Sequence, residues 1–332
     1  MQIPTYNENR MRIGLIDIDG RNFPNLALMK LSAHHKAKGD EVEWYEPMFG
    51  GHYDRVYCAK VFSFTPDYQY PIDADEVFYG GTGYQIKLID GKETWCKPDK
   101  QNFMTELPAE VEHTYPDYSL YPTMTEDTAY GFLTRGCPRG CSFCHVAAKE
   151  GKCSHKVADL TEFWHGQKNI VLCDPNLLAC KDWKELLQQL IDSGATLDIN
   201  QGLDIRMMTE EKAYMLSRCK IDQIHFAWDR YEDGPIILPK FKMFREAWER
   251  YHKWNEHGKI VYTLVNFDTT PEQDLERIYK LRELGYWAYV MIYDKKHCKD
   301  RFYKRLQRWV NNRILFAACQ RYEDYNEQLE NR

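Results

Sequence analysis

Residues 130–144, YGFLTRGCPRGCSFC, decide the fold of this chain of 332 residues. The first five are apolar or aromatic enough to predict a buried strand. Three cysteines follow with the spacing C-x₃-C-x₂-C, at Cys137, Cys141 and Cys144. Three soft thiolates on one short loop are typical of an iron–sulfur centre. Because this spacing leaves a cubane cluster one ligand short, the open iron can bind a small molecule.

The chain after this loop alternates short apolar strands with helical patterns. An apolar stripe from Trp183 to Ile191 ends at Gly194, and Thr270–Gln273 matches a capping box with Pro271 at the first helical position. Six strands in about 165 residues predict a partial (β/α)₆ TIM-type barrel, because a full eightfold barrel typically needs ~250 residues. The predicted strands are 130–134, 169–174, 197–202, 223–229, 260–266 and 288–294.

The residues before the loop predict a separate α/β unit. A helix is expected between Pro24 and Gly39, with Leu26, Met29 and Leu31 among its inward side chains. A strand–helix–strand start followed by further short strands favours a largely parallel, Rossmann-like sheet. Its strands are predicted at 11–17, 41–47, 55–64 and 76–83.

These patterns predict an α/β protein with several parts. Prolines at 108, 116 and 122 interrupt a stretch with few periodic apolar positions, which favours a linker there. The predicted organisation is a Rossmann-like domain at 1–104, a linker at 105–128, the partial barrel at 129–295 and a helical C-terminal extension at 296–332.

Composition excludes several classes of protein. Hydrophobic residues make up 43% and charged residues 28%, which is ordinary for a globular protein. Apolar runs fall far short of the ~20 residues that a membrane-spanning helix needs, and the N-terminus has no secretory pattern. The net charge of −6 gives no overall attraction to nucleic acid or anionic membranes. Eleven cysteines without a secretory signal predict a reducing, cytoplasmic location.

The cysteine spacing, the aromatic Phe143 before the last cysteine and the place of the loop after the first barrel strand resemble the radical S-adenosylmethionine (SAM) superfamily. The resemblance implies a 4Fe-4S cluster held by Cys137, Cys141 and Cys144, whose fourth iron chelates the amino and carboxylate groups of SAM. It implies reduction by an electron donor such as flavodoxin or ferredoxin. The resulting 5′-deoxyadenosyl radical would abstract hydrogen from a substrate that the sequence does not identify.

Polar residues stand at the predicted strand ends, where a β/α barrel places its active site. By resemblance, the residues after the second strand hold the methionine amino group, although Asp174 and Asn176 occur here in place of a Gly-Gly-Glu motif. Arg206 could pair with the methionine carboxylate. The structural alternative is that Asp174 and Asp204 cap turns. The predicted cofactor-binding residues are Phe143, Asp174, Asn176, Gln201, Asp204, Arg206, Asp229 and Asn266; Gln201 and Asp229 are the candidates for the ribose hydroxyls.

The N-terminal domain resembles the cobalamin-binding domain of one branch of the superfamily. The histidine motif of that branch, D-x-H-x-x-G, would fall near Asp17–Asn22, where no histidine stands. His34 and His35 are expected on a helix surface. Cobalamin is therefore allowed but disfavoured, since some members bind it without a protein histidine, and a degenerate domain is favoured. The glycine turn at 80–83 could approach a phosphate or a nucleotide tail.

Three functions remain open at this point. The favoured one is a radical SAM enzyme with an unidentified small-molecule or nucleotide-type substrate, and the alternative is a cobalamin-dependent radical SAM methyltransferase. A methylthiotransferase is disfavoured, because residues 1–125 contain only Cys58 and Cys96 as candidate ligands for a second cluster. The alternative from a different class is a non-catalytic iron–sulfur or zinc protein that binds nucleic acid. Its candidate surface is the basic segment 295–313, which carries about +7 and could instead attract an anionic substrate.

Overall fold

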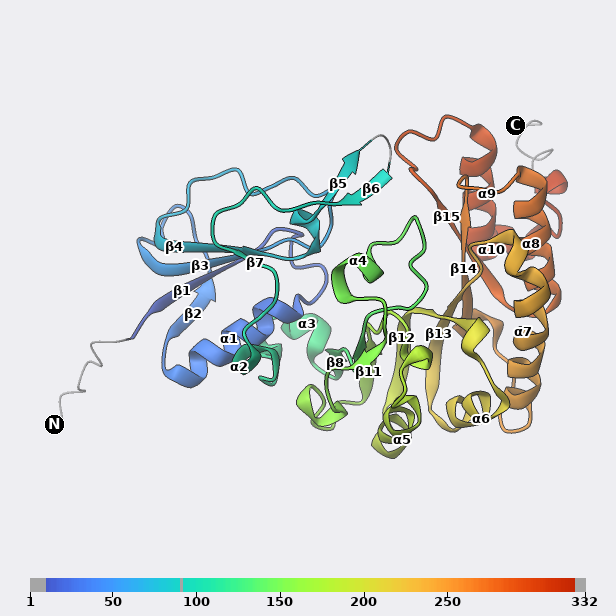
Figure 1. The fold of residues 1–332 in the computed structure, drawn as a ribbon, viewed down its shortest axis with the longest axis horizontal. Helices are drawn as coiled ribbons and strands as arrows, with labels where there is room; N and C mark the ends of the chain where they lie inside the picture. The colour runs from blue at the N-terminus through green and yellow to red at the C-terminus, as the bar shows by residue number, and fades with distance from the viewer. Residues whose placement is uncertain (1–9, 90–91, 326–332) are drawn as a thin grey trace. The chain divides into compact units, whose positions relative to one another are not determined.

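The computed structural model describes residues 10–89 and 92–325, and these form two compact units (Figure 1). One comprises Met1–Tyr130 with Thr161–Gln167, and the other comprises Gly131–Leu160 with Lys168–Arg332. Residues 1–9 and the last seven residues of the predicted C-terminal extension lie outside the described part. Within that part, no helix has both the length and the apolar composition needed to cross a membrane.

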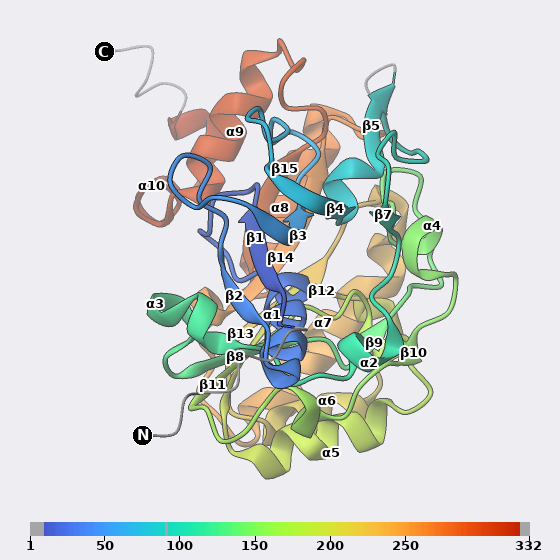
Figure 2. The ribbon, with the colours of Figure 1, turned by 90° about the vertical axis from the view of Figure 1, so that its left-hand side faces the viewer.

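The first unit is built on a parallel sheet with the order β2-β1-β3-β4-β7. The strand order reverses at β1, so the unit has the Rossmann-like topology predicted for it. A separate antiparallel pair, β5 (Ile86–Ile89) and β6 (Lys92–Trp95), follows β4. The elements of the main sheet are β1 (Arg12–Asp17), α1 (Leu26–Lys38), β2 (Glu41–Trp44), β3 (Tyr53–Ala59), β4 (Ala74–Gly80) and β7 (Phe103–Met104) (Figure 2).

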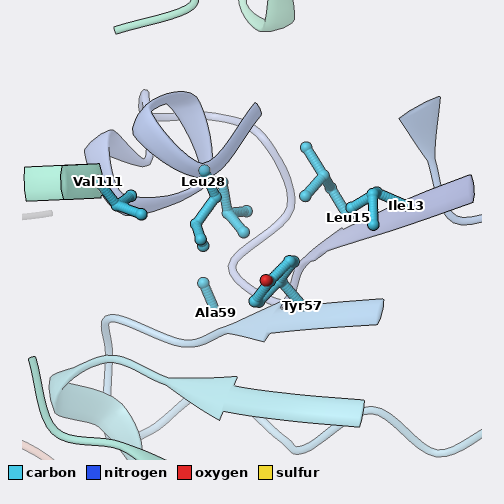
Figure 3. Close-up of a cluster of buried hydrophobic side chains, with 7 residues drawn as sticks. Ile13, Leu15, Leu28, Tyr57, Ala59 and Val111 are labelled. Carbon is cyan, nitrogen blue, oxygen red and sulfur yellow. The ribbon is translucent and has the colours of Figure 1, made fainter. Parts of the chain in front are cut away.

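The core of the first unit lies between α1 and the sheet. Asn25 caps α1 by accepting a hydrogen bond from the Leu28 backbone N–H, and Gly39 ends the helix in the left-handed conformation. Burial of apolar side chains against the strands supplies most of the stabilisation. The buried cluster comprises Ile13, Leu15, Leu28, Leu31, Tyr57, Ala59 and Val111 (Figure 3).

His35 was expected on the surface of α1, and that prediction was wrong. The imidazole is buried, with Nδ1 at 2.6 Å from Asp40 Oδ2 and Nε2 at 3.0 Å from the Tyr57 hydroxyl. Burial lowers the pKa of His35, although Asp40 opposes the shift. Three polar groups satisfy one another, which is what allows them to lie in the core.

The segment predicted as a linker, 105–128, contains α2 (Ala109–Glu112) and α3 (Pro122–Thr125) and belongs to the first unit. The Tyr118 hydroxyl donates to the Phe163 carbonyl at 2.6 Å. The Gln167 amide donates to the Tyr115 hydroxyl at 2.7 Å. These bonds explain why residues 161–167 group with the first unit.

The second sheet is a partial barrel of six strands in the order β8-β11-β12-β13-β14-β15, of which β11 to β15 lie in the second unit and β8 spans the boundary at Tyr130. The pairs from β11 to β15 are parallel, as predicted for a (β/α)₆ arrangement. The strands are β8 (Thr128–Gly131), β11 (Asn169–Leu172), β12 (Thr196–Leu203), β13 (Ile221–Ala227), β14 (Lys259–Val265) and β15 (Trp287–Ile292).

Helices connect most of these strands. They are α5 (Trp183–Ser193), α6 (Glu210–Arg218), α7 (Gly234–Glu249) and α8 (Pro271–Glu283). The two predicted helix boundaries are confirmed: Gly194 ends α5 in the left-handed conformation, and Thr270 and Gln273 form the capping box of α8. Two further helices, α9 (Arg301–Asn311) and α10 (Arg313–Ala318), follow β15.

Candidate iron–sulfur site

The three cysteines lie on an excursion that leaves the barrel at β9 (Thr134–Arg135) and returns at β10 (His155–Lys156). These two short strands pair antiparallel, with Thr134 opposite Lys156. The short helix α4 (Val146–Glu150) lies between the last cysteine and β10. The excursion is therefore a loop with a closed base and not an open connection.

Asp174 fixes the point at which this loop begins. Its side chain is fully buried after β11, and Oδ1 accepts from the Thr134 backbone N–H at 2.5 Å and the Thr134 hydroxyl at 2.7 Å. Oδ2 accepts from the Leu133 N–H at 3.1 Å. Burial raises the pKa of Asp174 to about 6, and the bonds from Thr134 and Leu133 oppose the shift. Because these N–H groups bond a side chain, the strand predicted at 130–134 is broken into β8 and β9.

Glu150 closes the loop from its other end. Its carboxylate accepts from the Gly136 N–H at 3.1 Å and from Arg135 Nη1 at 2.9 Å. Gly136 has φ +82°, and a Cβ there would lie 2.2 Å from the Cys153 carbonyl oxygen, so only glycine fits. Glu150 was not among the predicted site residues, because nothing in the cysteine spacing marks an acid that folds back onto the start of the loop.

Asn176, a predicted site residue, lies beside the first cysteine. Its Nδ2 is 3.5 Å from Cys137 Sγ, and its backbone carbonyl accepts from the Ser154 hydroxyl at 2.9 Å. The Oδ1 atom is buried and has no hydrogen-bond partner within the described residues. An unsatisfied buried acceptor next to a thiol fits a site that is completed by a bound group.

The other two thiols belong to the same electrostatic environment. The Cys144 N–H donates to the Cys141 carbonyl at 3.0 Å, which folds the last turn of the motif. Burial is the main cause that raises the pKa of the half-buried Cys141 thiol. Cys144 and Asp229 raise that of Cys141 further, and Arg206 opposes them. Iron binding removes such protons, because the thiolate is the metal ligand.

Across the described ranges, no three His, Cys, Asp or Glu side chains converge on a single point, as one tetrahedral zinc ion would require. The ligands of a cubane cluster bind separate irons and need not converge in this way. The residues that would hold such a cluster are Cys137, Cys141 and Cys144.

Charged residues at the end of β12 meet the cysteine loop. Asp204 forms ion pairs with Arg139 from the loop and, at 2.7 Å, with Arg206. Arg206 also pairs with Asp233 at 2.7 Å. Asp204 caps its own turn as well, by accepting from the Arg206 N–H at 3.1 Å. The structure thus brings the predicted Asp204 and Arg206 together. It adds Arg139 and Asp233, whose pairing no sequence pattern predicted. The contact of Arg206 with a methionine carboxylate stays a prediction.

Phe143 packs against Phe267, which follows the carboxyl end of β14. Its ring meets Phe267 edge-on, with centroids 5.4 Å apart, and Phe267 meets Tyr293 at 4.7 Å. Asn266 ends β14 with φ +63°, and its Nδ2 donates to the Tyr293 carbonyl at 3.1 Å. Phe143 therefore connects the cysteine loop to Phe267, whereas Asn266 joins the ends of β14 and β15 through Tyr293.

Asp229 lies at the end of β13 and is positioned by a buried arginine. Arg277 of α8 is fully buried, and its guanidinium donates to the Trp228, Asp229 and Leu264 carbonyls. Burial raises the pKa of Asp229 to about 6, and Arg277 opposes the shift. Gln201 is exposed near the end of β12. A ribose contact by either residue stays a prediction.

A row of polar and aromatic side chains lines the face of the sheet opposite α7. His225 and Tyr262 stack with ring centroids 5.0 Å apart, and Tyr262 meets Tyr289 at 5.9 Å. The His225 Nδ1–H donates to the Ile199 carbonyl at 2.8 Å. Asp198 lies beside His225, and its buried Oδ1 has no hydrogen-bond partner among the described residues. In a barrel this face of the sheet is the interior. The sequence pattern did not predict which side chains lie on it, because the strands of a buried parallel sheet are apolar on both faces.

In the first unit, the carboxyl ends of β1 and β3 are the place where a Rossmann-like sheet binds its ligand. Asp19 accepts from the Val61 N–H at 2.5 Å and the Thr65 hydroxyl at 2.6 Å. The strand that was predicted at 55–64 ends at residue 59, because backbone groups beyond it bond the Asp19 side chain. Three aromatic side chains are exposed here, namely Phe23, Phe62 and Phe64 at 47%, 45% and 82%. The loop after β1 supplies no histidine ligand for a cofactor at this edge.

The glycine turn after β4 has a packing role. A Cβ on Gly81 would lie 2.3 Å from the Lys60 carbonyl oxygen, and one on Gly83 would lie 2.7 Å from that of Phe62. The Gly83 N–H donates to the Lys60 carbonyl at 2.9 Å. These glycines are therefore required for the close approach of two backbones, and the predicted phosphate contact is not needed to explain them.

Comparison with known proteins supports the fold. Two solved structures of the radical SAM methyltransferase TsrM from Kitasatospora setae match with a TM-score of 0.59 and 13% sequence identity. One contains cobalamin and a 4Fe-4S cluster, and the other contains a tryptophan substrate and a SAM analogue, aza-SAM. The match covers 85% of this chain and 75% or 73% of the TsrM chain. This chain shares the fold of that enzyme. No family model and no curated protein matches the sequence.

Proposed function

We propose that this protein is a radical SAM enzyme of the cobalamin-dependent methyltransferase type. The observation that supports the proposal most strongly is the position of Cys137, Cys141 and Cys144. They lie on a loop with a closed base, beside Asn176, in a fold shared with a protein that binds a 4Fe-4S cluster and cobalamin. When bound, the cluster would supply the electron that cleaves SAM.

The residues of the chain would bind and orient the cofactors. Asn176 would hold Cys137 Sγ through its amide, and its unsatisfied Oδ1 is available to accept from a bound amino group. The pairs that Asp204 forms with Arg139 and Arg206 would keep the loop against the barrel. Phe143 and Phe267 would exclude water from the far side of the loop.

The case for cobalamin is stronger than the sequence alone suggested. The missing histidine disfavoured it, but the matching enzyme was solved with cobalamin bound. The exposed Phe23, Phe62 and Phe64 lie where a Rossmann-like sheet binds ligands. When bound, cobalamin would supply a methyl group for transfer, without a histidine ligand from residues 17–22. Methyl transfer therefore replaces hydrogen abstraction as the favoured reaction.

The substrate and the electron donor stay open in this proposal. Flavodoxin or ferredoxin is the expected class of donor, because the cluster must be reduced by one electron. The alternative of a non-catalytic nucleic-acid-binding protein predicts a metal centre without SAM cleavage. SAM cleavage therefore distinguishes the proposed enzyme from this alternative, whereas metal content does not.

The test uses protein purified and reconstituted with iron and sulfide under anaerobic conditions. The wild type should hold about four irons, absorb broadly near 400 nm and release S-adenosylhomocysteine or 5′-deoxyadenosine from SAM after reduction. Replacement of Cys137, Cys141 and Cys144 by Ala should remove all three signals. Cys153→Ala, at an exposed cysteine in the same excursion, is the matched control and should keep them.

Cobalamin is tested on the same protein. Protein produced with hydroxocobalamin in the medium should purify with a stoichiometric corrinoid spectrum. Purification without corrinoid, together with SAM cleavage, would return the proposal to hydrogen abstraction. A full cluster in the triple cysteine variant would contradict the site assignment itself.

A further inference from the structure

An open groove of about 400 Å³ lies between β15 and α9 in the second unit. The lining includes Tyr289 from the strand, Lys295 from the connection and, on α9, Lys304, Gln307 and Arg308. Residues 304, 307, 308 and 311 share one face of the helix, because they recur at i, i+3, i+4 and i+7. One face of α9 and the edge strand β15 therefore form the two walls of the groove.

Two amide side chains hold the helix in this position. Gln307 Nε2 donates to the Val290 carbonyl at 3.0 Å. Asn311 accepts from the Val290 N–H at 2.8 Å and donates to its carbonyl at 3.0 Å. β15 is the last strand of the sheet, so these bonds satisfy backbone groups that an edge strand would otherwise leave open. The buried Leu306, Trp309 and Val310 anchor the opposite face of α9.

The charged side chains that line the groove are all positive. Its lining contains Lys295, Lys304 and Arg308 and no carboxylate. Within the described part of the chain these three cations form no ion pair, whereas Arg206 and Arg277 each pair with an aspartate. Unpaired cations gathered along a concave surface attract anions. Their number matches a phosphate monoester, which carries about −1.5 to −2 at pH 7, better than a single carboxylate.

An aromatic ring stands beside these cations. Tyr289 is 43% exposed on β15, and it contacts Tyr262, which in turn stacks on His225 inside the barrel. A planar group can stack on such a ring while its phosphate meets the cations. The row from Tyr289 to His225 then leads from the groove along the interior face of the sheet.

We propose that the groove binds the phosphate of a small substrate whose planar ring lies against Tyr289, as in a nucleoside monophosphate. This inference rests on the proposed function, since it names the substrate class of that enzyme. A groove of this size and a net charge of −6 favour a small phosphate ester over a nucleic acid, which would need a longer basic surface.

The test measures binding of AMP to the full-length chain by calorimetry, with adenosine, indole-3-acetate and a 20-nucleotide single strand as comparison probes. The double variant Lys304→Gln with Arg308→Gln should bind AMP about tenfold or more weakly, since each charge-assisted contact contributes measurably. The control double variant Lys296→Gln with Lys299→Gln removes the same charge from exposed residues of the same segment outside the groove. It should bind AMP within about twofold of the wild type.

Tyr289→Leu should weaken AMP binding while leaving the affinity for inorganic phosphate unchanged. Equal losses in the two double variants would overturn the proposal, because attraction would then be non-specific. Equal affinity for adenosine or indole-3-acetate would overturn the assignment of a phosphate, and far tighter binding of the single strand would assign the surface to nucleic acid. SAM cleavage without added substrate is measured in parallel. If it is absent while AMP binds, the proposed function fails and the groove stands.

Discussion

Asp174 accepts hydrogen bonds from both the backbone N–H and the hydroxyl of Thr134, and so fixes the residue at which the cysteine loop leaves the sheet. Asp174 and Thr134 are both fully buried. A carboxylate can accept all three bonds that it receives here, whereas an amide has only one accepting oxygen. The loop therefore depends on a residue that was predicted to contact a cofactor.

Asp174→Asn is expected to lower the free energy of unfolding by about 1–3 kcal/mol, because the Leu133 N–H loses its acceptor in a buried position. The iron content after reconstitution should fall as well. Chemical denaturation and iron analysis measure the two effects. Asp268→Asn, at an exposed residue after β14, is the control and should change neither. Wild-type stability and iron content in Asp174→Asn would contradict the role given to this carboxylate.

Two glycines of the loop should respond differently to alanine. Gly136→Ala places a Cβ 2.2 Å from the Cys153 carbonyl, whereas a Cβ on Gly140 has nothing within 4 Å. Both residues have positive φ, so Gly140→Ala costs about 1 kcal/mol of backbone strain alone. Gly136→Ala must also move the base of the loop. Iron content should therefore be lost in Gly136→Ala and kept in Gly140→Ala; equal iron content in both would count against the loop geometry.

Asp198 should make stability depend on pH. Burial, with a smaller contribution from Asp222, raises the pKa of Asp198 to about 6 in the folded state. The folded protein therefore binds the proton more tightly than the unfolded chain, so this residue makes stability fall as pH rises from about 4 to about 6. The loss is at most about 3 kcal/mol.

Asp198→Asn should flatten that part of the profile, and urea denaturation at a series of pH values measures it. An unchanged slope in the variant would show that another group is responsible. Asp222→Asn removes the smaller contribution and should reduce the slope only in part.

Arg277 should matter more for stability than its place on an ordinary helix suggests. It forms a fully buried ion pair with Asp274 and donates to three backbone carbonyls. Arg277→Met leaves Asp274 buried without its partner, which should cost about 3–5 kcal/mol. Lys280→Met on the same helix removes an exposed ion pair and should cost less than about 1 kcal/mol. Similar losses in the two variants would contradict this account.

Patterns within a short stretch of sequence predicted the fold well. The capping box at Thr270, the left-handed Gly194 and the cysteine spacing all depend on neighbours along the chain, so their residues could be identified directly. The Rossmann-like unit and the six barrel strands followed from the same periodicity.

Contacts between distant residues could not be predicted. The Glu150 carboxylate bonds Gly136 across the loop, Asp174 breaks a strand that comes 40 residues earlier, and His35 is buried because Tyr57 and Asp40 satisfy it. In each case a polar side chain is paired by folding and not by spacing. The groove at α9 needed the structure too, since only packing on β15 distinguishes its cations from an exposed basic helix.

The central claim is that Cys137, Cys141 and Cys144 hold a 4Fe-4S cluster with one iron open to SAM. Electron paramagnetic resonance of the anaerobically reduced protein, recorded with and without SAM, tests it most directly. We predict that SAM changes the spectrum of the reduced cluster, because its amino and carboxylate groups bind the open iron. A cluster whose spectrum is identical in the presence of saturating SAM would contradict the account.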